Sequence, residues 1–295
     1  MNHLETGPHT VEIDGLEQQY HVHGAGPLVF AHSGGPGLGW GYLRMPEAEE
    51  RLTVVYIEPI GTGRSGKLDD PAGYTYSRYA RQLEGLADHL GIERITVIGH
   101  SSGGFVALRF AIEHPERVAS LVLYDTSAVV NEEYYADVMA NVEAFPARHP
   151  GHERSVADAL QAWENQGAVT DDAGFTAIAR RVFPLYFRDY WADEARYAAL
   201  GAHLEGWLAP QRAGGTVDDL ALLPAVAQPV LVIVGRYDFI CGPKWSALMA
   251  DALPDARLVV LEDSGHFGHL ETPAEFAAAV TSFVLEDASV SGATR

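Results

Sequence analysis

Short, unbroken apolar stretches recur along this 295-residue chain, and each is bounded by glycine, proline or polar residues. Stretches of this length are typical of β-strands that are buried on both faces. Other segments carry apolar residues at helical spacing, as Tyr79, Leu83, Leu86 and Leu90 do before Gly91. The pattern predicts strands at 27–32, 52–57, 94–98, 119–124, 229–234 and 257–261, and helices at 76–90, 102–114, 244–252 and 273–285.

Strands and helices alternate regularly through most of the chain. Such alternation predicts right-handed crossovers between parallel strands, with helices covering both faces of the sheet. Burial on both faces also explains why the strand segments are continuously apolar. A β-hairpin over 10–23, turning at Asp14-Gly15, precedes the first of them. We therefore predict an α/β fold with a mostly parallel central sheet flanked by helices.

The segment 127–215 interrupts this alternation. Helix-forming and aromatic residues dominate it, it contains no strand-like run, and prolines at 146, 150, 184 and 210 break it. We predict an inserted segment of several short helices, which divides the chain into a core of 1–126 and 216–295 and a helical cap of 127–215. The end of the chain, 286–295, is polar and aperiodic, and we expect it to be frayed.

The charge balance limits the partners of this chain. Lys and Arg number 20 against 40 Asp and Glu, and the formal net charge of −20 would be repelled by nucleic acids and anionic membranes. Cys241 is the only cysteine, which excludes an intrachain disulfide and a multi-cysteine zinc site and fits a reducing compartment. Residues 1–10 lack a secretory signal, and no apolar run approaches the ~20 residues needed to span a bilayer. We expect a cytoplasmic protein without nucleic-acid or membrane partners.

The sequence Gly99-His100-Ser101-Ser102-Gly103 lies between a predicted strand and a predicted helix. A serine on so sharp a turn adopts a strained backbone, and the residues two before and two after it must lack a Cβ to avoid clashes. Both of these positions are glycine, and the N-terminus of the following helix favours developing negative charge. We predict Ser101 to be a catalytic nucleophile; the alternative is a passive serine in a glycine-rich turn.

A serine hydroxyl needs a general base, and the base needs a carboxylate to orient it. His266 lies just beyond the last predicted strand, and the chain order Ser, Asp, His is the one expected for this architecture. We predict His266 as the base, with His269 as its rival. His100 and His32 are expected to be structural, because the first would point beneath the turn and the second ends a strand.

The predicted acid is Asp238, which follows the strand 229–234. Ser101, Asp238 and His266 would then all lie beyond the carboxyl ends of parallel strands, where ligands bind in open α/β sheets. Asp125, beyond the strand 119–124, is the alternative acid. If it is not the acid, we expect it to cap the start of the inserted helices.

An acyl-transfer site also needs hydrogen-bond donors for the oxyanion of the tetrahedral intermediate. One predicted donor is the backbone N–H of Ser102, the residue after the nucleophile. The second is expected from the loop 33–37, Ser-Gly-Gly-Pro-Gly, where glycines let the backbone approach a substrate. We predict Gly35 for this role, with Gly34 as the alternative.

These motifs resemble those of the α/β-hydrolase-fold serine hydrolases, and the Gly-Gly-Pro-Gly loop is similar to that of the proline iminopeptidase-related branch. The resemblance implies an α/β-hydrolase fold in which Ser101 is the nucleophile, Asp238 the acid and His266 the base, with a helical cap over the site. The motifs that carry it lie at 33–37, 61–65 (Gly-Thr-Gly-Arg-Ser), 99–103, 235–238 (Gly-Arg-Tyr-Asp) and 264–266 (Ser-Gly-His).

Three features depart from the iminopeptidase pattern. Ser33 stands where a histidine usually precedes Gly-Gly-Pro-Gly, and Ser102 where a tryptophan usually follows the nucleophile. The aromatic run 183–187 lacks the preceding glutamate that would hold a substrate's free amine. Glu164 or Glu205 could substitute for it, but nothing in the sequence requires this.

We predict a cofactor-independent serine hydrolase, without a metal site, that cleaves a carboxylic ester or amide bond of a small, partly apolar substrate through an acyl-enzyme on Ser101. The alternatives are a proline iminopeptidase-like aminopeptidase, an acyltransferase or cyclase, and a non-catalytic binding protein on the same fold. The aromatic residues of the cap suggest an apolar roof over the pocket, or else simply the cap's own core. No oligomeric state follows from the sequence.

Overall fold

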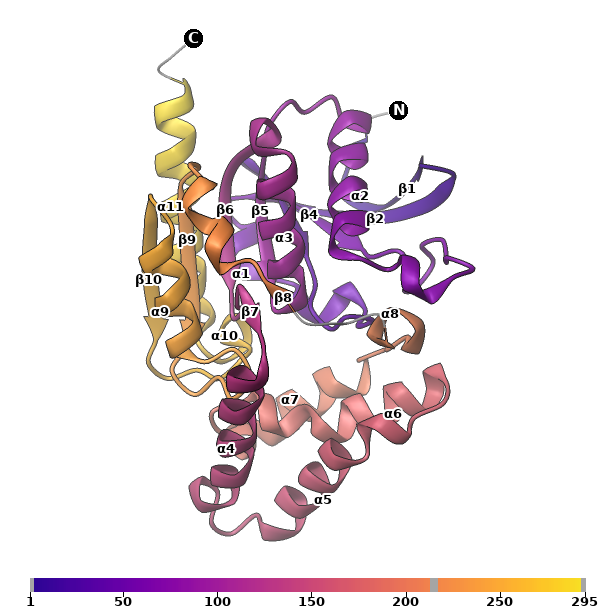
Figure 1. The fold of residues 1–295 in the computed structure, drawn as a ribbon, viewed down its shortest axis with the longest axis vertical. Coiled ribbons are helices and arrows are strands. Elements are labelled where there is room, and N and C mark those ends of the chain that lie inside the picture. Colours follow the sequence, from indigo (N-terminus) through magenta and orange to yellow (C-terminus); the bar gives the residue numbers. More distant parts are fainter. Residues whose placement is uncertain (1–2, 213–216, 293–295) are drawn as a thin grey trace.

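The computed structural model describes residues 3–212 and 217–292, and its centre is an eight-stranded sheet (Figure 1). The strand order is β1-β2-β4-β3-β5-β6-β9-β10, in which β1 pairs antiparallel with β2 and β2 with β4, while every other pair is parallel. The predicted α/β fold with a mostly parallel sheet is confirmed. The strands are β1 Gly7–Ile13, β2 Leu16–Gly24, β3 Leu28–His32, β4 Thr53–Glu58, β5 Ile95–His100, β6 Val118–Tyr124, β9 Val230–Gly235 and β10 Ala256–Leu261.

Helices cover both faces of the sheet, as the continuously apolar strands require. One face packs against α2, α3 and α9 around side chains such as Leu83, Val106 and Met249. The other packs against α1 and α11 around Ala48 and Phe276. The helices of this part are α1 Pro46–Glu49, α2 Tyr76–His89, α3 Ser102–Glu113, α9 Pro243–Ala252, α10 Gly268–Glu271 and α11 Pro273–Gly292.

The two ends of the predicted pattern differ from the structure. The hairpin turns at Asp14 and Gly15, both at positive φ, as predicted, but β1 begins at Gly7 rather than at residue 10. The helix α11 continues to Gly292. The prediction of a frayed tail is therefore wrong for residues 286–292. Residues 293–295 of this tail lie outside the described residues.

The inserted segment forms a group of helices at one end of the sheet, drawn below it in Figure 1. Its side chains pack onto the segments that follow the last strands: Phe145 shares a cluster with Phe239 and with Trp245 of α9, and Phe183 shares one with Phe267. Its helices are α4 Glu132–Arg148, α5 Glu153–Glu164, α6 Asp172–Val182, α7 Glu194–Ala202 and α8 Leu208–Arg212.

A two-stranded ladder pairs the start of this segment with the chain just beyond it. The strand β7 (Val129–Val130) pairs antiparallel with β8 (Val217–Asp218). The prediction that the segment contains no strand is therefore wrong at β7, because two residues are too few for a periodic pattern to reveal. The predicted cap boundary at 215–216 lies outside the described residues.

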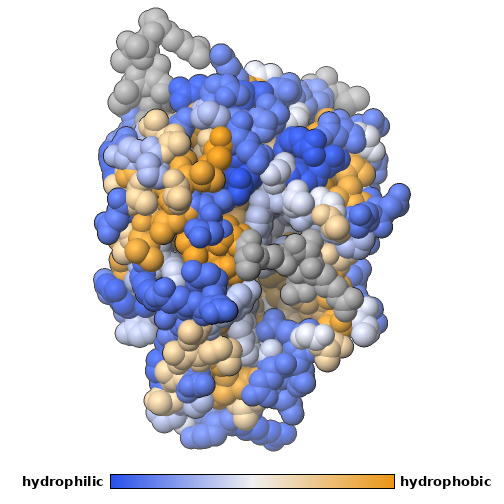
Figure 2. All heavy atoms as spheres, in the orientation of Figure 1, coloured by the Kyte–Doolittle hydropathy of each residue, from blue (hydrophilic) through white to orange (hydrophobic). Residues whose placement is uncertain are grey.

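The surface seen in Figure 2 is largely hydrophilic, with apolar residues also exposed on the side of α9 and β10, where Leu248 and Leu258 lie. Within the described parts of the chain, no helix combines the length and the apolar character that crossing a membrane requires. The cytoplasmic location stays a prediction.

Candidate active site

Ser101 lies on the turn that joins β5 to α3, with a backbone φ of 53° and ψ of −119°. Its N–H donates to the carbonyl oxygen of Tyr124 at 2.9 Å, and its own carbonyl oxygen accepts from the Thr126 hydroxyl at 2.7 Å. A Cβ at Gly99 would overlap the carbonyl of Gly103, and one at Gly103 would overlap the carbonyl of His32. The turn therefore requires glycine at both positions and holds its serine in a conformation that costs about 1–3 kcal/mol.

His266 and Asp238 form a buried hydrogen-bonded pair. The Nδ1 atom of His266 lies 2.9 Å from Oδ2 of Asp238, and both side chains are almost wholly buried. The other carboxylate oxygen of Asp238 accepts the backbone N–H groups of Ile240 at 2.9 Å and Cys241 at 3.1 Å. The loops after β9 and β10 supply the two residues, and the parallel pairing of those strands places the loops side by side. With Nδ1 engaged, Nε2 is the ring nitrogen of His266 that is left for a proton transfer.

Ser101 and His266 line the same cavity, which has a volume of about 80 Å³. No Asp, Glu, Lys or Arg is among the described residues that line it, and the Ser101 hydroxyl makes no hydrogen bond to any described residue. The remaining walls are Gly35, Leu38, Tyr42, His100, Gln166, Phe175, Ala179, Val182, Phe183, Tyr186, Leu204, Ile240 and Phe267.

The loop after β3 presents one of its two glycines to this cavity. Gly35 lines the cavity, and its N–H has no acceptor among the described residues. The N–H of Gly34 donates instead to the Tyr42 hydroxyl at 2.6 Å. Ser102 is the first residue of α3, so its N–H has no partner within the helix. The geometry thus favours Gly35 over Gly34 as a donor beside Ser102.

Comparison with known proteins places the chain in a family. A family model of the α/β hydrolase fold matches residues 26–273. The chain belongs to the α/β hydrolase family. This α/β hydrolase is 30% identical over 278 residues to a 2-hydroxymuconate semialdehyde hydrolase of Pseudomonas sp. (strain CF600), and the match covers 92% of each chain. It is also 30% identical over 272 residues to a putative carbamate hydrolase of Pseudomonas savastanoi, covering 89% of this chain and 95% of the relative.

A solved structure agrees with these sequence relatives. The proline iminopeptidase of Mycobacterium smegmatis superposes on this hydrolase with a TM-score of 0.73 at 25% identity, covering 97% of this chain and 100% of that one. The named relatives are hydrolases, so the chain is an enzyme of this class. Their names describe different substrates, and membership of the family therefore leaves the substrate open.

The three other histidines near the site of this α/β hydrolase are buried and hydrogen-bonded. His269 has both ring nitrogens engaged, with the Tyr42 carbonyl at 2.8 Å and the Tyr124 hydroxyl at 2.9 Å, and burial lowers its pKa to about 4. Burial also lowers the pKa of His32 to about 4, and its Nδ1 lies 2.9 Å from the Ser33 carbonyl. Neutral, engaged rings of this kind suit a structural role.

Tyr42 connects the glycine loop to the loop of His266, and no sequence motif pointed to it. His100 Nε2 lies 2.9 Å from the carbonyl oxygen of His266 and donates to it. The Nδ1 atom of His100 therefore accepts, at 2.8 Å, the hydroxyl proton of Tyr42, which in turn accepts the N–H of Gly34. Burial raises the pKa of Tyr42 and lowers that of His100, which keeps both groups neutral.

Asp125 is wholly buried. The expectation that it would cap the start of the inserted helices is wrong. The helix α4 is capped by Asn131, whose side chain accepts from the Tyr134 N–H. Asp125 accepts instead from the N–H of Gly235 at 2.8 Å. The physical reason is that Asp125, with φ of 45°, lies against the end of the neighbouring strand β9, and its own N–H donates to the Ile233 carbonyl there.

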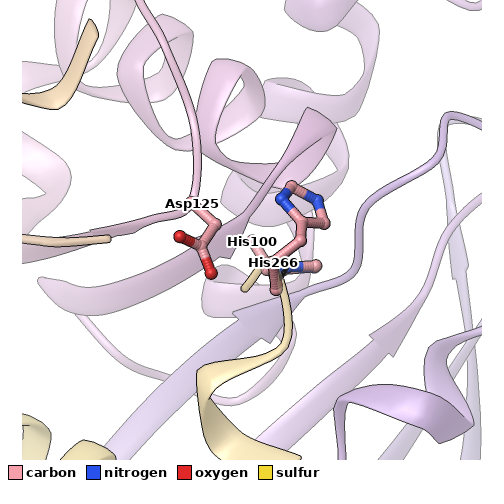
Figure 3. Close-up of side chains that lie close together, drawn as sticks. All are labelled: His100, Asp125 and His266. Atoms are coloured by element: carbon pink, nitrogen blue, oxygen red, sulfur yellow. Dashed lines mark hydrogen bonds between the residues drawn. The ribbon is translucent and has the colours of Figure 1, made fainter. Parts of the chain in front are cut away.

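Two groups of described side chains have the types and spacing of metal ligands. One is exposed in part and consists of Glu84, His114 and Glu116. The other consists of His100, Asp125 and His266, which lie close together in Figure 3. Both nitrogens of His100 are already engaged in hydrogen bonds, so this second group lacks the free donors that a metal ion requires.

Proposed function

We propose that this hydrolase cleaves a carboxylic ester of a small, uncharged substrate through an acyl-enzyme on Ser101. The observation that carries the proposal is that Ser101 and His266 line one cavity and that Asp238 is hydrogen-bonded to the histidine. Ser101 lines the cavity from a strained turn, and His266 lines it with Nδ1 held by the buried Asp238 carboxylate. This is the set of groups that converts a serine hydroxyl into a nucleophile.

In the proposed mechanism, the Ser101 oxygen attacks the substrate carbonyl carbon while its proton passes to Nε2 of His266. The carbonyl oxygen becomes an anion that accepts the N–H groups of Gly35 and Ser102. The intermediate collapses, and the leaving alcohol takes the proton from the imidazolium. Water then attacks the acyl-serine by the same path and releases the acid, with His266 as base again. Every step uses groups of this chain and water, so the mechanism requires no cofactor.

The lining of the cavity supports an uncharged acyl group. A carboxylate or an ammonium group would lose its hydration there without meeting an opposite charge. Glu164 and Glu205, the possible amine-binding residues, are exposed and do not line the cavity. Seven of its lining residues come from the inserted segment, which we propose as a cap over the site: Gln166, Phe175, Ala179, Val182, Phe183, Tyr186 and Leu204.

A panel of p-nitrophenyl esters and aminoacyl p-nitroanilides, the latter both free and N-blocked, tests this proposal. We expect turnover of short-chain esters and little turnover of any anilide. The likeness to a proline iminopeptidase makes aminopeptidase activity the second candidate. Preferred turnover of free over N-blocked anilides would support that candidate and contradict the ester hydrolase.

A further inference from the structure

A second buried carboxyl group lies beside the Asp238–His266 pair. Asp125 follows β6 as Asp238 follows β9, and the parallel pairing of these strands brings their ends together. The N–H of Asp125 donates to the Ile233 carbonyl at 2.9 Å, and its Oδ1 accepts from the Gly235 N–H at 2.8 Å. Figure 3 shows its carboxyl group near His266 and His100, and one side-chain oxygen of Asp125 lies within 4.8 Å of a nitrogen of each ring.

The two carboxyl groups have unequal surroundings. Asp238 accepts two backbone N–H groups on one oxygen and faces Nδ1 of His266 with the other. Asp125 accepts one, and its Oδ2 is buried without a hydrogen-bond donor among the described residues. An ionised oxygen in that position would carry a large desolvation cost. If the pair holds a proton, the carboxyl with fewer donors is the one that keeps it.

The electrostatic surroundings agree with this assignment. Burial and the neighbouring carboxyl of Asp238, with which Asp125 is in hydrogen-bond contact, raise the pKa of Asp125 well above its ordinary range. Glu271 acts in the same direction from further away. Tyr124 and Cys241 are the other acidic groups within its electrostatic reach, and His100 and His266 are the basic ones.

We propose that Asp125 is a neutral carboxylic acid that donates a hydrogen bond to the Asp238 carboxylate, and so acts as a positioning residue for His266. The effect of Asp125 on catalysis rests on the proposed function, whereas its protonation and its hydrogen bond to Asp238 do not. The donated proton gives Asp238 a further hydrogen bond and fixes the rotation of its carboxylate, so that Oδ2 stays directed at the imidazole. It also keeps a second negative charge away from the base.

The isosteric variant Asp125→Asn separates a neutral from an ionised Asp125. An amide can donate to Asp238 and accept from Gly235, and asparagine tolerates the positive φ of this position. We expect kcat/KM within about threefold of wild type and an unchanged apparent pKa on the acid limb of its pH profile. An ionised Asp125 would instead support the protonated imidazole, and its loss would lower that apparent pKa by about one unit or more.

The variant Asp125→Ala removes the hydrogen bond altogether. We expect kcat to fall about tenfold or more with little change in KM. Asp14→Ala is the matched control, because Asp14 also has a positive φ, of 51°, but is exposed in the β1–β2 turn. It carries the same backbone penalty and should leave kcat unchanged.

Infrared difference spectroscopy gives a readout that does not depend on activity. Wild type minus Asp125→Asn, both in a Ser101→Ala background, should show the carbonyl stretch of a protonated carboxylic acid near neutral pH. If only a carboxylate band is lost, or if Asp125→Asn is as inactive as Asp238→Asn, the inference is overturned. A Ser101→Ala enzyme that stays active would contradict the proposed function. The infrared result would still show whether Asp125 is protonated, because it does not depend on activity.

Discussion

The two walls of the cavity are held in place in different ways. The floor, which comprises Gly35, His100, Ser101 and His266, comes from the ends of strands and the loops that follow them, and directional hydrogen bonds hold much of it. Ser101 N–H bonds to Tyr124 and His266 N–H to Tyr186, the latter at 2.7 Å. The roof, which comprises Phe175, Ala179, Val182, Phe183 and Leu204, is built from side chains of the inserted segment that are held by apolar packing.

Because of this difference, we expect the floor to determine the rate of the reaction and the roof to determine substrate specificity. Hydrogen bonds are directional, so they can hold reacting atoms within a few tenths of an ångström. Apolar packing fixes volume and shape but tolerates substitution by side chains of similar size. Changes in the floor should therefore alter the rate of the reaction, while changes in the roof should alter which substrates react.

The largest expected effect is that of Ser101→Ala in the floor. Removing the nucleophile should abolish covalent labelling by a fluorophosphonate and lower ester turnover by about 10⁵-fold or more. Ser102→Ala is the control, since the proposal uses only the backbone N–H of that residue. Labelling that survives in Ser101→Ala would place the nucleophile elsewhere.

Asp238→Asn should produce the next largest effect, because the amide favours the wrong tautomer of the imidazole. We expect kcat to fall by about 10⁴-fold with the fold retained. The measurement is kcat on a p-nitrophenyl ester, together with a circular dichroism spectrum. If Asp238→Asn keeps near-normal activity while Asp125→Asn is inactive, Asp125 rather than Asp238 is the residue that orients His266.

Glu271 joins floor to roof, and its ionisation should make stability depend on pH. Its carboxyl accepts the N–H groups of Gly265 at 2.6 Å and Arg188 at 2.7 Å, and burial raises its pKa to about 7 from 4.5. Between these values the folded state binds more protons than the unfolded chain, so the contribution of Glu271 to the free energy of unfolding falls as pH rises.

Urea unfolding of Glu271→Gln at pH 4.5 to 7 measures this contribution. The free energy of unfolding of wild type should decrease relative to the variant by up to about 3 kcal/mol across that range. Glu275→Gln removes an exposed carboxylate from the following helix and serves as the control. Parallel curves for wild type and Glu271→Gln would show that the Glu271 carboxyl has an ordinary pKa.

The smallest expected effect is that of a roof substitution. Ala179→Leu adds methyl groups on the face of α6 that lines the cavity, and it should lower kcat/KM for longer acyl chains by about tenfold. Acetate esters should be affected less. Ala177→Leu, on the exposed side of the same helix, should change neither. An equal loss for all chain lengths would mean that the roof also positions the reacting groups.

Much of the fold could be predicted because strands that are buried on both faces are continuous runs of apolar residues in the sequence. The predicted strand at 94–98, for example, differs from β5 by a residue or two at its ends. The strand β7 and the continuation of α11 could not be predicted in this way, since one is too short for a pattern and the other is too polar. Glycines around Ser101 marked the turn because only that residue type fits there.

No sequence motif indicated the hydrogen-bond partners of Tyr42 and Asp125. Tyr42 lies outside every motif, and its hydroxyl acquires a role only when Gly34 and His100 are folded against it. Asp125 and Asp238 have the same local context, an aspartate after a buried strand. The sequence predicted Asp238 as the acid and left Asp125 as the alternative, and in the fold it is Asp238 that contacts the imidazole.

The order of apolar and glycine residues was enough by itself to determine the alternating architecture, the turn at 101 and a short set of possible catalytic side chains, because these depend on local sterics and on burial. The tertiary structure decided the rest: the contact of the Asp238 carboxyl with Nδ1 of His266, the free N–H of Gly35, and a cavity that no Asp, Glu, Lys or Arg of the described residues lines. These depend on contacts between residues that are separated along the chain, such as Asp238 and His266, 28 positions apart, and such contacts are set only by strand pairing and helix packing.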